Sequence, residues 1–79
     1  MSAKEYHKRL WLTMMHARSI FIDLIMELGH VVTKMREFGE NADENVKKHL
    51  HEFKKIYDDA NELFSSFERA RTAFEREVL

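Results

Sequence analysis

A chain of 79 residues without cysteine forms at most one small domain, and it has no route to disulfides, thiolate metal sites or thiol catalysis. Its 13 basic and 14 acidic residues nearly cancel, so no molecule-wide field draws it to nucleic acid or to an anionic membrane. A domain this short hides only about 60% of the surface of its unfolded chain. Oligomerisation is then the leading way to enlarge the core.

The N-terminal stretch M-S-A-K-E-Y-H-K-R is polar and lacks the short apolar run of a secretory signal. The most apolar window, residues 10–32, is interrupted by five charged or histidine side chains, which argues against a membrane-spanning helix. We expect a soluble, cytoplasmic protein with no membrane partner.

The chain has no proline and only two glycines, so helix is locally preferred almost everywhere. Ser2 and Glu5 form an S-x-x-E capping box that predicts a helix start near residue 3. Gly39 predicts its end, and Asn41 with Glu44 forms a second capping box. The sequence predicts a single all-α domain, a long antiparallel helical hairpin with helix 1 at about 3–38, a turn at 39–41 and helix 2 at about 42–78.

Apolar residues recur in each predicted helix at alternating spacings of three and four, which is the pattern of a coiled-coil seam. The first row of helix 1 is Leu10, Met14, Ala17, Phe21, Leu24, Leu28, Val31, Met35 and Phe38. The row of helix 2 is Val46, Leu50, Phe53, Tyr57, Ala60, Phe64, Phe67, Arg71, Phe74 and Val78, in which Arg71 breaks the pattern. Pairing large residues with small ones predicts Phe21 opposite Ala60 and Phe64 opposite Ala17.

Helix 1 carries a second apolar row about 100° from the first, interrupted by Arg18. In a lone hairpin this row would be exposed to solvent, and a contiguous exposed apolar stripe is typical of an interface. We therefore expect the hairpin to dimerise into a four-helix bundle, with Gly29 admitting the backbone of the second copy. The sequence leaves open whether the row is the homodimer interface or a target-binding face, and how the two copies are oriented. The interface candidates are Trp11, Met15, Ile22, Ile25, Gly29 and Val32.

Glu27 and His30 form an E-x-x-H pair, a spacing that supplies metal ligands in helical bundles. The predicted register brings His49 and Glu52 opposite, which makes these four residues weak metal candidates. A solvated polar edge is the favoured interpretation, because Glu27 and His30 flank the seam. We expect no cofactor.

Basic residues gather near both ends of the predicted hairpin, but acidic residues lie among them. Phosphate binding requires a basic surface that its neighbours do not neutralise, so RNA or DNA binding is the alternative function and is not favoured. The candidate contacts to a macromolecule are Lys8, Arg9, Arg69 and Arg71.

No serine, threonine or lysine has a base and an orienting group at helical spacing, so an enzyme is not expected. The sequence favours a small regulatory protein that acts as a dimeric helical bundle, binding and occluding another protein. A phage-borne or mobile-element-borne inhibitor is one format with these properties.

Overall fold

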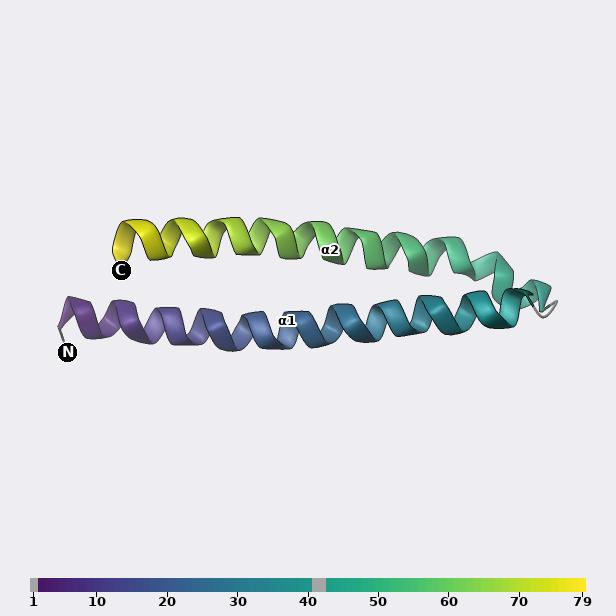
Figure 1. Ribbon diagram of the computed structural model, residues 1–79, viewed down its shortest axis with the longest axis horizontal. Helices are drawn as coiled ribbons and strands as arrows, with labels where there is room; N and C mark the ends of the chain where they lie inside the picture. Colours follow the sequence, from purple (N-terminus) through teal and green to yellow (C-terminus); the bar gives the residue numbers. More distant parts are fainter. Residues whose placement is uncertain (1, 41–42) are drawn as a thin grey trace.

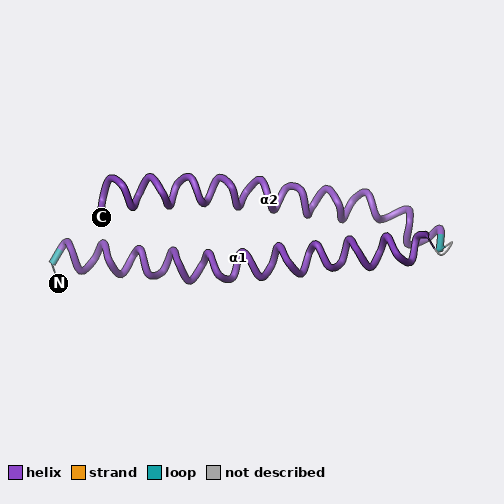
Figure 2. Tube along the Cα trace, in the orientation of Figure 1, coloured by secondary structure: helices purple, strands orange, loops and turns teal. Residues whose placement is uncertain are grey.

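The computed structural model describes residues 2–40 and 43–79, which form two long helices lying side by side and antiparallel (Figure 1). Helix α1 comprises Ala3–Glu40 and helix α2 comprises Glu44–Val78. The pair makes a rod with extents of 60 × 16 × 12 Å. Nearly the whole described chain is helical, as Figure 2 shows, and the predicted all-α hairpin is confirmed. Neither helix has an apolar stretch sufficient to cross a bilayer.

The helix starts follow from capping side chains. The backbone N–H of Glu5 donates to Ser2 Oγ at 3.2 Å, which confirms the predicted start of α1. At α2 the cap is Asp43, whose carboxylate accepts the backbone N–H groups of Asn45 and Val46. Helix 2 therefore begins two residues later than predicted, and α1 runs two residues past its predicted end. The predicted box at Asn41 lies outside the described residues.

Helix α1 meets α2 through a contact row that mixes the two predicted rows. Its members are at least half-buried and alternate in steps of three and four: Trp11, Met14, Arg18, Phe21, Ile25, Leu28, Val32 and Met35. Val32, 7% exposed, is the one buried residue among those whose burial the structure describes. Leu24, expected against helix 2, is 52% exposed, whereas Ile25, expected to face outward, is half-buried. That division of the apolar surface of α1 was wrong.

The row predicted for α2 is largely confirmed, because most of its members are half-buried. Phe64 and Phe67 both pack on Phe21, with ring centroids 5.3 and 6.1 Å apart. Arg71 occupies its place in the row with a side chain only 16% exposed. Phe53 and Val78 are the members left more open, each at 38%.

The predicted register is wrong by about one helical turn. The ring of Phe21, expected opposite Ala60, packs on the ring of Phe64, and an added Cβ on Gly29 would lie 3.4 Å from the ring of Tyr57. One turn of slip keeps the same face of α2 inward, so the pattern of α2 alone does not discriminate between the two registers. In the observed register the N-terminal end of α1 extends past the C-terminal end of α2 (Figure 1).

Candidate functional site

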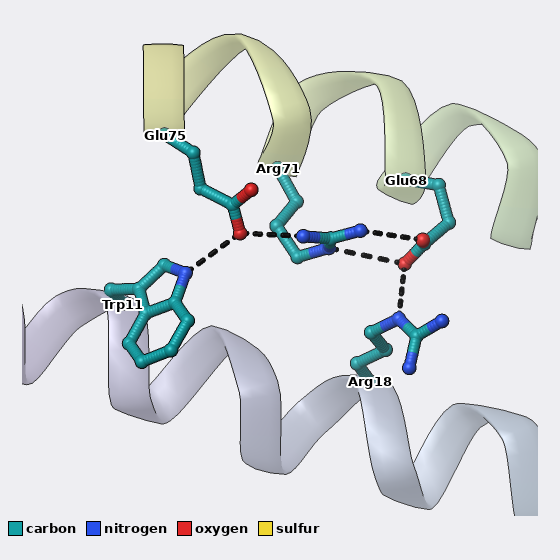
Figure 3. A network of polar contacts seen from close by, with 5 residues as sticks. All are labelled: Trp11, Arg18, Glu68, Arg71 and Glu75. Atoms are coloured by element: carbon teal, nitrogen blue, oxygen red, sulfur yellow. Dashed lines mark hydrogen bonds and ion pairs between the residues drawn. The ribbon is translucent and has the colours of Figure 1, made fainter. Parts of the chain in front are cut away.

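Five residues near the open end of the hairpin form a continuous polar cluster, shown in Figure 3 and called the polar cluster from here on. They are Trp11 and Arg18 of α1 with Glu68, Arg71 and Glu75 of α2. Successive turns of α2 supply its three members, because residues three and four apart share one helix face. Both breaks in the apolar rows, Arg18 and Arg71, belong to this cluster.

Glu68 accepts hydrogen bonds from an arginine of each helix. Arg18 Nε donates to Glu68 Oε1 at 2.8 Å across the helix contact, and Arg71 Nη2 donates to Oε2 at 2.7 Å within α2. The Arg18 guanidinium also lies 5.9 Å from the centroid of the Phe64 ring. A planar guanidinium can pair with a carboxylate and stack on a ring at once, which a lysine ammonium cannot do in the same way.

Glu75 completes the cluster at its outer end. Trp11 Nε1–H donates to Glu75 Oε2 at 2.7 Å, and Arg71 Nη1 donates to the same oxygen. A half-buried indole N–H needs such a partner. Trp11, predicted at an interface with another chain, is therefore tied to α2 of its own chain.

The hydrogen bonds shift the pKa values of three groups in this cluster, each in the direction that favours the charged form. The Arg71 hydrogen bond, followed by that of Arg18, holds the pKa of Glu68 below its ordinary value of 4.5. The Trp11 and Arg71 hydrogen bonds lower the pKa of Glu75 in the same way. The two carboxylates raise the pKa of Arg71 further above its already high value. All three groups stay charged near neutral pH. The cluster is therefore a network of ion pairs that links the two helices, and not a proton-transfer site.

The other predicted interface residues take several positions around α1. Val32 is buried in the hairpin, Gly29 packs against Tyr57, and Met15 and Ile22 are half-buried at one edge of the helix contact. The close approach expected at Gly29 therefore has a neighbour within the chain, the Tyr57 ring.

The four metal candidates do not converge. Glu27 is exposed, and His49 lies 3.7 Å from Glu52 on the surface of the same helix. His30 and His49 line one groove near the turn, without Glu27 or Glu52 among its lining residues. Within residues 2–40 and 43–79 no three His, Asp or Glu side chains are close enough to hold a metal ion.

The four candidate macromolecule contacts are in two different environments. Lys8, Arg9 and Arg69 are exposed, and Arg69 donates to Ser66 Oγ at 3.1 Å. Arg71 is held inside the hairpin by two carboxylates. Of these four candidates, only Lys8, Arg9 and Arg69 are exposed to solvent.

One further surface, which we call the open face, was not predicted from the sequence. Val31 and Phe38 of α1 and His49 and Phe53 of α2 line one apolar groove near the turn. Residues seven apart keep to one side of a packed helix, so the rows of Val31 and His49 continue along the rod. The open face comprises Leu10, Ala17, Leu24, Val31 and Phe38 of α1 with His49, Ile56, Leu63, Ala70 and Glu77 of α2.

Most of this face is solvent-exposed in the hairpin. Leu24, Val31, Phe38, Ile56 and Leu63 are all among the exposed large apolar residues. The signal was present in the sequence, because the five α1 members belong to the nine-residue first row and a weak row of Ile56, Leu63 and Ala70 runs along helix 2. Assigning the α1 residues to the intrachain seam concealed it.

Comparisons with protein-family models, curated proteins and solved structures gave no match for this chain. Its function is therefore inferred from the surface chemistry of the hairpin.

Proposed function

We propose that this chain is a non-enzymatic interaction protein that assembles as a homodimeric four-helix bundle and acts by binding and occluding another protein. The observation that carries the proposal is the open face, a largely apolar surface that runs along the rod. Large apolar side chains are exposed there, such as Leu24 at 52% and Leu63 at 62%. Removing them from water by covering them with another surface lowers the free energy.

The total exposed area supports assembly. A folded monomeric protein of 9.5 kDa exposes about 5,000 Å² by the usual scaling of surface with mass. The hairpin exposes 6260 Å². The excess of roughly 1,200 Å² shows that the two-helix rod covers less of its surface than a compact domain of the same mass does.

The hydroxyl groups support a non-enzymatic role. Those of Thr13, Thr33, Ser65 and Ser66 each donate to a backbone carbonyl one turn earlier in the same helix. A nucleophilic hydroxyl instead needs a side-chain base within hydrogen-bond reach.

A second surface, the polar face, lies opposite the open face and remains accessible in such a dimer. It comprises Lys8, Met15, Ile22, Gly29 and Arg36 of α1 with Lys47, Lys54, Asn61, Glu68 and Glu75 of α2. Near the turn, Arg36 and Lys54 line a groove beside Gly29 and Tyr57. Among the described residues neither cation is in an ion pair, so this part of the face suits an acidic protein segment.

Protein is favoured over nucleic acid as the target for two reasons. Asp58 also lines the groove, and Glu68 and Glu75 lie further along the same face, so a phosphate backbone would meet both signs of charge. Met15 and Ile22 add apolar area that phosphate and sugar do not use.

Retention assays with the immobilised protein and an extract of the cells that produce it test this proposal. We expect a specific protein to be retained by the wild-type chain and lost with the double variant Arg36→Glu, Lys54→Glu. The matched control Lys48→Glu, an exposed charge reversal away from the groove, should retain it. Retention of nucleic acid that falls steeply with salt, or protein retention equal in the double variant, would overturn the assignment.

A further inference from the structure

The open face has a size gradient along the rod that becomes visible only in the observed register. The Gly29 and Tyr57 contact and the Arg18 and Glu68 ion pair fix which levels of the two helices face each other. On that register Ala17 lies level with Ala70, Leu24 with Leu63, and Val31 with Ile56. The face is therefore shallow at the level of Ala17 and Ala70 and bulky from Leu24 and Leu63 to the turn, with Leu10 and Glu77 at the terminal end.

Two symmetric arrangements bring one open face onto another. In the first, both turns lie at the same end, and Ala17 of one copy faces the partner's Ala70. That places small side chains on small ones and leaves a gap, while the bulky levels near the turn meet each other. In the second, the turns lie at opposite ends and the two-fold axis passes at the level of Leu24 and Leu63.

The second arrangement matches large side chains to small ones. Ala17 then lies on the partner's Val31, Ala70 lies on the partner's Ile56, and Leu10 lies on the partner's Phe38. Facing layers reach native packing density when large and small residues alternate in this way. The polar ends of the α2 row also agree, because the Glu77 carboxylate lies on the partner's His49, whose ring N–H can donate a hydrogen bond to it.

We infer that the occupant of the open face is a second copy of this chain, packed with its turn at the opposite end and with the two-fold axis near Leu24 and Leu63. The inference rests on the dimer of the proposed function and adds its face and its orientation. The size of the face is enough for such a dimer, because a rod with Cα extents of 60 × 16 Å along this side presents an area on the order of the 800 Å² that each partner contributes to a standard stable interface.

Orientation is measured by the distance between spin labels on Lys48→Cys, because the chain contains no other cysteine and Lys48 is exposed on the outer side of α2. Lys48 lies 15 residues from Leu63 along α2, so at 1.5 Å per residue the labels in the inferred dimer are about 45–50 Å apart. With both turns at one end they are less than about 30 Å apart, since only the bundle width separates them. Pulsed electron paramagnetic resonance distinguishes these distances.

The face is tested with Leu24→Glu and the matched control Met26→Glu. Met26, 67% exposed, lies on the opposite side of α1 because two residues turn a helix by about 200°. Sedimentation equilibrium should give twice the 9.5 kDa chain mass for the wild type and for Met26→Glu, and the single-chain mass for Leu24→Glu. Circular dichroism should show that the variants stay helical, and Leu63→Glu replaces Leu24→Glu if it does not.

The outcomes separate the inference from the proposed function. A monomeric wild type overturns both the dimer and the inference. A dimer with the short label distance, or one that Leu24→Glu and Leu63→Glu leave intact, overturns the inference and leaves the dimeric interaction protein standing. The long distance together with dissociation by Leu24→Glu supports the inference.

Discussion

Replacing Gly29 by alanine should stabilise the hairpin, although Gly29 lies in a close contact between helices. A Cβ at this position would meet two atoms of the Tyr57 ring at 3.4 Å and the phenol oxygen at 3.5 Å, which are ordinary van der Waals distances. Glycine inside a helix costs about 1 kcal/mol relative to alanine, and no steric cost offsets that gain. We expect the free energy of unfolding to rise by about 0.5–1 kcal/mol.

Urea unfolding followed by circular dichroism at one fixed protein concentration measures this change. The matched control is Gly29→Ala in a Tyr57→Ala background, where only helix propensity changes the free energy of unfolding. A similar increase in that free energy in both backgrounds confirms that the Tyr57 ring tolerates the added methyl group. Gly29→Leu should instead destabilise by about 1–3 kcal/mol, because its side chain must displace the Tyr57 ring. A loss of stability in Gly29→Ala that disappears in the Tyr57→Ala background would refute the reasoning.

Three further predictions concern the core, the cap and the polar cluster. Val32→Ala should cost about 2 kcal/mol in urea unfolding, since it removes two methyl groups from a side chain only 7% exposed, and a cost below about 0.5 kcal/mol would contradict the helix packing described here. Asp43→Ala should cost about 1 kcal/mol, whereas Asp43→Asn should retain most of the stability because the amide oxygen still accepts the N–H groups; equal losses in both would exclude a capping role. Because the folded-state pKa values of Glu68 and Glu75 lie below 4.5, their contribution to stability is present above pH 4.5 and is lost as the pH falls through the lowered values. The thermal midpoint should therefore fall on acidification less in Glu68→Gln than in the wild type or in the control Glu77→Gln, and identical pH profiles would show that the cluster contributes no pH-dependent stability.

The inward side of α2 could be predicted because one row of aromatic and apolar residues was available to it. Helix α1 carries two apolar rows. The observed contact row takes Met14, Phe21, Leu28 and Met35 from the first of them and its other members from the second. Hydrophobic spacing cannot choose between rows that are both apolar. Arg18 distinguishes the two rows. It appeared to interrupt an outward-facing row, but it pairs with Glu68 across the helix contact.

The polar cluster was unpredictable in detail for a related reason. Arg71 appeared as a break in the α2 row, and no rule of spacing along one helix identifies a partner on another. Its own-helix neighbours Glu68 and Glu75, three and four residues away, were the available signal. With the register one turn off, the α1 members Trp11 and Arg18 could not be placed beside them.

Composition and local rules by themselves determined that this chain is two long helices joined by one turn, because the absence of proline and the Ser2 cap act within a few residues of the chain. Only the tertiary structure decided which apolar residues became core and which became the open face. That choice depends on the relative rotation and register of two helices, which are set by side-chain pairs such as Arg18 with Glu68 and Gly29 with Tyr57. These pairs are far apart in sequence, and they are compatible with the same periodic pattern in more than one register.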